Sequence, residues 1–351
     1  MTSTRPEAPN ASWRKSLPGN LGQDIVDEID AYMERVPGAA SCVATGSLVE
    51  GIGNGNSDID LYVIQPSGST ATAPVAIGIR DSRYVDVEYL TLTALHKLAD
   101  AFADTTGGEA PRTLSLRDFS RYYRLAIAAR LKTTEETEAL LDRCSTRRCS
   151  ALFAPWSLAQ AATYLARASV ARGLGDVPRA VVLTRRAAVW RATSQLADEG
   201  EGYPHLKWAT VKAARRFGAD TPAYRSCVSG HDVTPATLGT TLAELRERVP
   251  PQAGAQGGDE AGWTLAGGVD TLSDGDVLRL IRGRASIARI DGLPRVLVSR
   301  LAEGRPWPET VELTAEQLRV TPDDVRTTAA PLMRELADAG YLASAAQGGR
   351  R

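Results

Sequence analysis

Two aspartates separated by one residue follow a glycine-rich loop in the stretch "GSLVEGIGNGNSDIDLYVI", residues 46–64. Side chains two residues apart on a β-strand point to the same face, so Asp58 and Asp60 should project together while Ile59 packs behind them. Two carboxylates so close repel each other unless a cation lies between them, and oxygen ligands are those that Mg²⁺ prefers. The spacing therefore predicts a magnesium site.

A third carboxylate is available on a later apolar segment, "YVDVEYL", residues 84–90. Asp86 and Glu88 again share one face of a predicted strand. Either of them, brought beside Asp58 and Asp60, would complete a cluster of three carboxylates around the metal.

Glycine and serine residues around the acid pair predict a loop that binds phosphate. Gly46 and Ser47 come first, and the loop of residues 51–57 ends at Ser57. Backbone N–H groups in such loops can approach a phosphate closely. We therefore expect the metal and a nucleoside triphosphate to meet here.

Together these features resemble the signature of the DNA polymerase β-like nucleotidyltransferase superfamily. The matching residues are Gly46 and Ser47, then Asp58 and Asp60 after a spacer, and Asp86 on a later strand. The resemblance implies transfer of a nucleoside monophosphate, with the first two acids holding two Mg²⁺ ions and the third acid holding the catalytic one. It also implies in-line attack of an acceptor hydroxyl on the α-phosphorus, with pyrophosphate as the leaving group.

The choice of the third acid follows from a narrower resemblance. Residues 86–95, "DVEYLTLTAL", are similar to a strand and helix of small-molecule adenylyltransferases such as those that inactivate aminoglycosides. The acid leads the strand there, which favours Asp86 over Glu88. Arg80 and Arg83, just before it, could face phosphate or only keep a loop soluble.

The resemblance implies ATP as donor and a hydroxyl or other acceptor on a small molecule or peptide. The alternative is a non-catalytic nucleotide- or peptide-binding scaffold that keeps the fold.

Two basic segments, residues 183–191 and 205–216, are predicted helices whose cationic faces could hold a triphosphate. Solvated helix surfaces are the competing interpretation. Arg186 of the first segment is a possible phosphate contact. Lys207 of the second lies in "LKW", which resembles the "LK-x-W" helix of RNA-tailing relatives with a spacing that differs by one residue. That resemblance implies nucleotide binding by Lys207.

The elements that must position these side chains follow from apolar periodicity. An amphipathic helix is predicted within residues 21–36, and β-branched apolar runs at 41–47, 58–64 and 84–92 predict strands. Helical patterns then continue for more than a hundred residues, including one over 116–131. The predicted fold class is α+β, a nucleotidyltransferase-type mixed sheet with flanking helices, followed by a helical bundle and a small winged-helix-like domain.

The stretch "PPQAGAQGGDEAGW" has the composition of a flexible linker and predicts a domain boundary. Beyond it we expect a strand and three helices, one of them over residues 289–302. The expected domains are a nucleotidyltransferase catalytic domain (20–105), a helical domain (106–249), a linker (250–262) and a winged-helix-like domain (263–345).

The C-terminal segment raises the question of partners. "IDGLPRVLVSRLAEG" and "AAPLMRELADAGYL" loosely resemble PqqD-like winged-helix domains that bind leader peptides, and equally resemble DNA-binding winged helices. The segment is not strongly basic, which disfavours DNA, because duplex affinity comes mostly from Lys and Arg on phosphates. A docking domain for a peptide or carrier protein and a plain structural or dimerisation module remain open.

Composition limits the other functional classes. The chain has 351 residues, 43% hydrophobic and 24% charged, with a formal net charge of -1. Nothing in that balance attracts nucleic acid or an anionic membrane. No apolar run is long enough to span a bilayer, so we expect a cytoplasmic protein. The four cysteines lack the spacing of a zinc site and are expected to be reduced thiols.

Overall fold

In this computed structural model the described residues are 23–33, 36, 40–54, 56–67, 75–80, 83–250, 262–283 and 286–344. The chain divides into two compact units. Unit 1 comprises residues 1–156 and 193–224, and unit 2 comprises residues 157–192 and 225–351. Residues of the expected helical domain are thus distributed over both units. Most of the expected linker, residues 251–261, lies outside the described residues.

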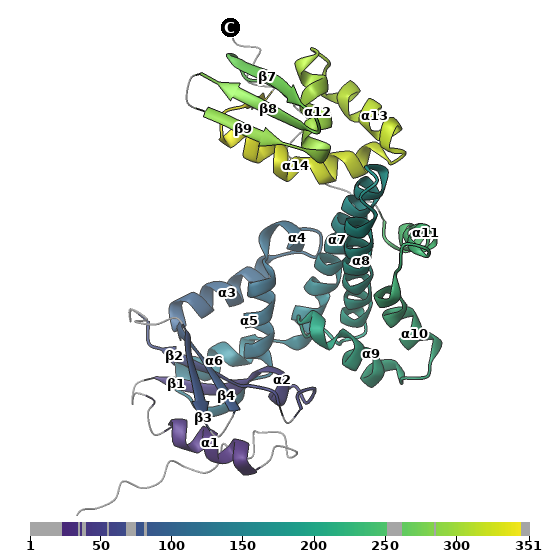
Figure 1. Ribbon diagram of the computed structural model, residues 1–351. Coiled ribbons are helices and arrows are strands. Elements are labelled where there is room, and N and C mark those ends of the chain that lie inside the picture. Colours follow the sequence, from purple (N-terminus) through teal and green to yellow (C-terminus); the bar gives the residue numbers. More distant parts are fainter. Residues whose placement is uncertain are drawn as a thin grey trace, which may run out of the picture. The chain divides into compact units, whose positions relative to one another are not determined.

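A five-stranded sheet forms the centre of unit 1, with strand order β3-β4-β2-β1-β5 (Figure 1). Strands β2 and β4 pair in parallel, whereas the other neighbours are antiparallel. The sheet is therefore mixed, and the fold class is α+β, as the sequence predicts. The strands are β1 (Ser41–Thr45), β2 (Ile59–Gln65), β3 (Val75–Arg80), β4 (Arg83–Thr91) and β5 (Ala129–Lys132).

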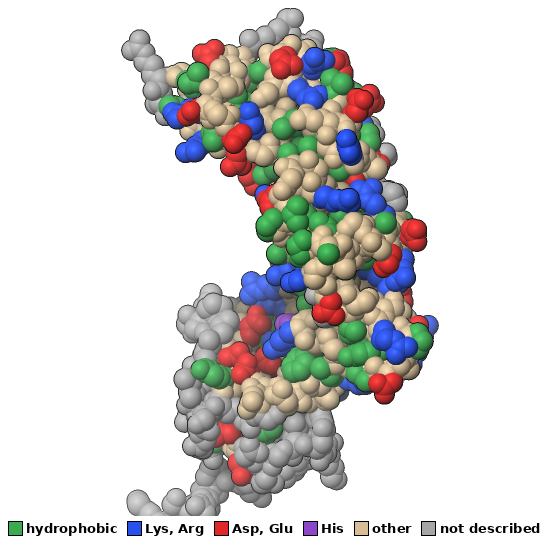
Figure 2. Space-filling view, turned by 45° about the vertical axis from the view of Figure 1, so that its right-hand side comes forward, with side chains coloured by type: hydrophobic (Ala, Val, Ile, Leu, Met, Phe, Trp, Pro, Cys, Tyr) green, Lys and Arg blue, Asp and Glu red, His purple; other side chains and the backbone are tan. Residues whose placement is uncertain are grey.

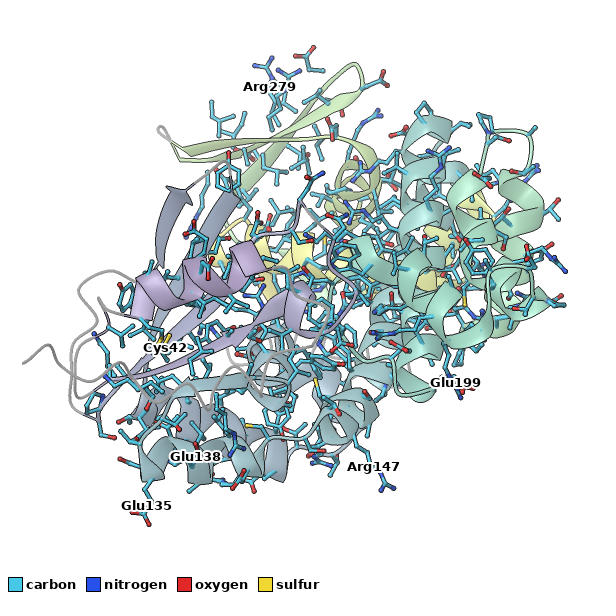
Figure 3. The ribbon with its side chains drawn as sticks, turned by 90° about the horizontal axis from the view of Figure 1, so that it is seen from below. Cys42, Glu135, Glu138, Arg147, Glu199 and Arg279 are labelled. Carbon is cyan, nitrogen blue, oxygen red and sulfur yellow. The ribbon has the colours of Figure 1, made fainter. Side chains whose placement is uncertain are left out.

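Helices cover both faces of this sheet, so the central strands are apolar on both sides. Helix α1 (Gln23–Met33) packs on one face, where it buries a cluster that includes Cys42 and Leu61. Helices α3 (Leu92–Asp104), α5 (Leu116–Ala126) and α6 (Glu135–Arg143) lie on the opposite face (Figure 1). Cys42 on β1 is buried, whereas Glu135 of α6 points outward at the edge of the view in Figure 3.

The remaining elements of unit 1 are short helices and parts of two long ones. Trp156, near the unit boundary, packs against Phe119 and Phe153, and its indole N–H donates to the carbonyl of Leu114 at 2.8 Å. This aromatic cluster continues the core away from the sheet. These elements are α2 (Gly46–Val49), α4 (Ala110–Thr113), parts of α7 (Thr146–Gly173) and α8 (Val177–Asp198), the 3₁₀ turn η2 (Leu206–Trp208), α9 (Ala209–Phe217) and the start of α10 (Pro222–Val228).

Unit 2 contains the other parts of α7, α8 and α10, the helix α11 (Leu238–Arg248) and the C-terminal region. In that region an antiparallel sheet, β7-β8-β9, packs on three helices (Figure 1), and β6 pairs with β10. Val170 of α7 belongs to the same buried cluster as the C-terminal helices. The elements are β6 (Trp263–Leu265), β7 (Val269–Asp274), β8 (Val277–Arg282), β9 (Ser286–Ile290), α12 (Gly292–Ala302), α13 (Trp307–Leu318), α14 (Pro322–Asp338) and β10 (Leu342–Ser344).

Several predicted elements differ from the structure. The helix expected over 116–131 ends at Ala126, because residues 129–132 pair with the edge of β1 as strand β5. The helix expected from Arg289 begins only at Gly292, since Arg289 pairs with Arg279 in the sheet. Strand β3 was not predicted at all. In each case pairing with a neighbouring strand outweighs the local pattern.

Candidate functional site

Two of the predicted acids are direct neighbours across the sheet. Asp60 of β2 and Asp86 of β4 are register partners in the parallel pair, and Asp58 immediately precedes β2. Register partners on adjacent strands share a face. Ile59 and Leu61, on either side of Asp60, are buried, as alternation requires. The structure therefore brings the carboxylates of the predicted cluster to one region of unit 1.

The side chain of Asp60 lies against Gly46. Gly46 has a positive φ of +82°, and a Cβ atom at this position would overlap the Asp60 carboxylate. Glycine is required here both by its conformation and by this close approach. Gly46 and the buried Ser47 open the short helix α2 directly after β1. The observed role of Gly46 is thus to make room for a carboxylate.

A buried arginine contacts Asp60. Nη2 of Arg124, on α5, lies 3.2 Å from Oδ1 of Asp60, and the two side chains are only 18% and 14% exposed. The hydroxyl of Thr45 donates to the carbonyl of Arg124 at 2.8 Å, which holds α5 at the end of β1. The guanidinium also lies 6.0 Å from the ring centre of Tyr62. Arg124 is therefore fixed within the carboxylate cluster.

The surroundings of these carboxylates disfavour their negatively charged form. Burial raises the pKa of Asp60 to about 6; the carboxylates of Asp86 and Asp58 add to this, while Arg124 and Lys207 oppose it. Burial, and then Asp58, likewise raises the pKa of Asp86. Arg124 and Lys207 are two cations beside three acids, so the cluster attracts further positive charge.

Glu88, the second choice for the third carboxylate, is already neutralised. Its carboxylate accepts from Nε of Arg121 at 2.9 Å, makes a further short contact with the same guanidinium, and lies 3.5 Å from Nη2 of Arg117. No ion pair to Asp86 is seen within the described ranges. The geometry therefore favours Asp86 over Glu88 as a ligand, and the assignment itself stays a prediction.

The three arginines form one face of α5 that sequence reasoning missed. Arg117, Arg121 and Arg124 are spaced i, i+4 and i+7, and all three contact carboxylates of β2 or β4. A capping box of Ser115 and Asp118 begins the helix. The spacing in "RDFSRYYR" was the available signal, because such residues share one helix face.

The second predicted basic segment contributes less free charge than expected. Lys212 is wholly buried, and its ammonium donates to the carbonyl of Tyr203 at 2.7 Å. Arg215 pairs with Glu50 and Glu201, and Arg216 pairs with Glu199. These side chains thus already have partners within unit 1, and triphosphate binding by this segment stays a prediction.

Lys207, of the same segment, is exposed. Its ammonium lies 5.3 Å from the ring centre of Trp208, and its charge acts on Asp60. Beside it, Nε2 of His205 lies 3.3 Å from the hydroxyl of Ser120. Burial, and then Arg124, Lys207 and Lys212, lowers the pKa of His205 to about 4, so this imidazole is neutral at physiological pH. A lone histidine carried no signal in the sequence.

Other predicted contacts stay predictions. The hydroxyl of Ser57 accepts from the backbone N–H of Asn54 at 2.9 Å and closes an exposed turn. Arg80 and Arg83 lie at the ends of β3 and β4, and their side chains fall outside the described residues. Arg186 lies in unit 2, on an exposed position of α8.

The carboxylates are the type of ligand, with the charge, that a hard divalent cation requires. Their positions in the structure do not form a site for one. Asp58, Asp60 and Asp86 supply only oxygen donors. Among the described residues, however, no three acidic, histidine or cysteine side chains stand close enough together to hold a metal ion. The Asp60 carboxylate is engaged with Arg124 instead.

On the face of the molecule drawn in Figure 2, acidic side chains gather beside basic ones in the lower part of the view. Among the helices of the described segments, none has the length and apolar character to cross a membrane. Cys42, Cys144, Cys149 and Cys227 are all free thiols.

Comparison with known proteins adds little to this geometry. No family model and no curated protein matches the chain. Among solved structures, the chain is similar to a nucleotidyltransferase-like protein from Exiguobacterium sibiricum 255-15, with 11% sequence identity, 63% of this chain and 74% of that chain covered, and a TM-score of 0.25. A likeness at that TM-score carries no argument about activity, so the functional assignment depends on the residues of the site.

Proposed function

We propose that unit 1 is a Mg²⁺-dependent nucleotidyltransferase that transfers a nucleoside monophosphate, with AMP from ATP as the first candidate, to an acceptor on a small molecule or peptide. The observation that supports this most is the register of Asp60 with Asp86 on parallel strands, with Asp58 just ahead and a helix face of arginines opposite. Carboxylates for metal and guanidinium groups for phosphate are the two chemistries that the reaction requires.

In the reaction, the acceptor hydroxyl oxygen forms a bond to the α-phosphorus and gives its proton to solvent water, while the bond from that phosphorus to the bridging oxygen breaks and pyrophosphate leaves. Asp58, Asp60 and Asp86 would hold Mg²⁺, which supplies stabilisation of the charge on the phosphate oxygens. Gly46 leaves the space that Asp60 occupies. Arg124 and Lys207 place positive charge where the triphosphate would lie.

A second candidate is a nucleotide-binding scaffold without catalysis. The specific observation in its favour is the ion pair of Asp60 with Arg124, which occupies one expected metal ligand. Such a protein would bind a nucleotide through its cationic side chains and release no pyrophosphate.

The C-terminal region of unit 2 is proposed to dock the acceptor when that acceptor is a peptide or carrier protein. Strands β7 and β9 are the two edges of its sheet, and they carry the exposed apolar side chains of Leu272 and Ile287. An extended peptide can add to such an edge through backbone hydrogen bonds, with apolar side chains giving specificity.

The test is a nucleotide panel with Mg²⁺, scored for pyrophosphate release and for labelled acceptor, on the full chain and on three Asp→Asn variants. We expect loss of transfer in Asp58→Asn, Asp60→Asn and Asp86→Asn, because a neutral amide cannot balance the metal's charge. Wild-type rates in Asp60→Asn would remove the assignment. Nucleotide binding without pyrophosphate release from any nucleotide would favour the scaffold.

A further inference from the structure

Unit 2 contains a cavity of about 600 Å³, a size typical of sites for small molecules. It lies among the end of α7, one face of α11 and the end of α13. Arg172 of α7, Arg246 of α11 and Arg319, which follows α13, line it. None of the described residues that line it is acidic. Three cations in a wall without acids attract an anion.

Arg246 is held in place by two partners. Its Nη2 donates to the hydroxyl oxygen of Ser169 at 2.8 Å and makes a short ion pair with Asp324. Asp324 in turn accepts from the backbone N–H of Thr321 at 3.3 Å in the capping box of α14. Within the described part of the chain, Nε and Nη1 of Arg246 have no acceptor. The guanidinium is therefore positioned with donors still available to a ligand.

Arg172 has no acceptor of its own. Within the described segments its side chain forms neither an ion pair nor a hydrogen bond, and it is exposed. A Cβ atom at Gly239 would lie 3.5 Å from Nη2 of Arg172, so the guanidinium lies against the first turn of α11. The first turn of a helix carries partial positive charge. Two positive groups thus stand side by side at the cavity, an arrangement that an anion stabilises.

Arg319 occupies a backbone position that favours glycine. Its φ is +54°, and every other residue with a positive φ in the described ranges is a glycine. A residue with a Cβ atom is strained in this conformation. The attraction of a cation to the C-terminus of α13 does not exceed that cost, which indicates a further role for the charge. The side chain is exposed and has no partner among the described residues.

The wall of the cavity also has an apolar part. Leu242 and Leu318 line it and are buried, and Val320 lines it and is half-buried. The three arginines carry three positive charges and Asp324 neutralises one, which leaves two. A phosphomonoester carries about two negative charges near pH 7, whereas a carboxylate carries one. The charge and the apolar surface together match a phosphomonoester on an organic body.

We propose that unit 2 binds a small molecule bearing a phosphomonoester group in this cavity. Arg172, Arg246 and Arg319 hold the phosphate oxygens, because guanidinium N–H groups are arranged for paired contact with an oxyanion. The organic part of the ligand lies on Leu242 and Leu318. This site goes beyond the proposed transfer reaction and does not depend on it, because all of its residues belong to unit 2.

The test is isothermal titration calorimetry of the full chain at low salt with phenyl phosphate, benzoate and inorganic phosphate. Phenyl phosphate should bind about tenfold or more tightly than benzoate because of its second charge, and more tightly than inorganic phosphate because of its ring. Arg172→Gln should weaken phenyl phosphate binding about tenfold. Arg319→Gly should weaken it by a similar factor and raise the melting temperature, since glycine suits the positive φ.

Arg289→Gln is the matched control. Arg289 is an exposed arginine of β9 in unit 2, lies outside the cavity and has no side-chain partner within the described residues. This variant should bind phenyl phosphate like the wild type. Gly239→Leu keeps every charge but fills the space where the Arg172 guanidinium lies, so it should also weaken binding.

The proposal is overturned if the wild type does not bind phenyl phosphate, or binds benzoate equally well. It is also overturned if neither Arg172→Gln nor Arg319→Gly weakens binding, or if Arg289→Gln weakens it as much, because the attraction would then be non-specific. If Arg172→Gln does not fold, Arg319→Gly still decides, since that change relieves strain. The presence or absence of nucleotidyl transfer does not alter this result, because the residues proposed for transfer belong to unit 1.

Discussion

Replacing Asp60 by asparagine should make the metal-free protein more stable at neutral pH while it abolishes transfer. Burial, reinforced by Asp86 and Asp58, raises the pKa of Asp60 from its ordinary value of 3.8 to about 6. A raised pKa means that Asp60 favours folding most below pH 3.8 and that this contribution is lost as the pH rises through 6. This rise in the pKa of Asp60 corresponds to about 3 kcal/mol of unfolding free energy, which we take as the upper value. The neutral amide of the variant never carries the charge and avoids this loss.

The assay is denaturant unfolding of both proteins in EDTA between pH 4 and 8, with pH values chosen across the interval set by the pKa shift. The gain in free energy of unfolding of Asp60→Asn over the wild type should grow from pH 4 to pH 7 and then level off. Asp142→Asn, an exposed aspartate of α6, controls for the loss of one negative charge. If Asp60→Asn is less stable than the wild type at pH 8, the attraction of Arg124 outweighs the burial of the carboxylate and the reasoning fails.

Three further predictions follow from the same contacts. Glu88→Gln should keep transfer, whereas Asp86→Asn should lose it; the opposite pattern in a pyrophosphate assay would reverse their roles. Gly46→Ala should cost about 1–2 kcal/mol of stability from its positive φ and weaken metal–nucleotide binding by displacing Asp60, and unchanged calorimetric titration would contradict this. A chain ending at Val249 should keep nucleotide binding but melt at a lower temperature, because Val170 loses its buried neighbours from the C-terminal helices. Loss of nucleotide binding would show that the removed region supports the site.

Strand alternation is local, so the sequence alone could predict that Asp58 and Asp60 share a face if one strand covers both. In the structure β2 begins at Ile59, just after Asp58, and the role of the pair as metal ligands stays a prediction. The partnership of Asp60 with Asp86 depends instead on which strands pair, and β3 lies between β2 and β4 in the chain but not in the sheet. No local pattern contains that order, so the register came only from the structure.

The cationic side of the site was harder to predict, because charge type does not determine burial. Lys212 looked like an exposed helix cation, yet backbone carbonyls of residues 201 and 203 enclose its ammonium. Burial lowers its pKa to about 8, and Glu201 and Glu50 oppose that effect. Arg124 lay in a helical pattern with aromatic neighbours, and its acid partner is 64 positions earlier in the numbering of the printed sequence. Long-range partners of this kind are invisible to spacing arguments.

Helix α5 is tethered unequally at its two ends, and this has a consequence for motion. At its C-terminal end the Arg124 carbonyl is bonded to Thr45, and β5 joins the sheet three residues after Ala126. The exposed fraction of the arginine side chains falls along the helix, from 67% at Arg117 to 25% at Arg121 and 18% at Arg124. Local unfolding of α5 should therefore begin at its first turn. It should break the ion pairs of Glu88 with Arg117 and Arg121 before that of Asp60 with Arg124. Amide hydrogen exchange along the helix would then become slower from its first turn to its last, with the carboxylate cluster at the protected end.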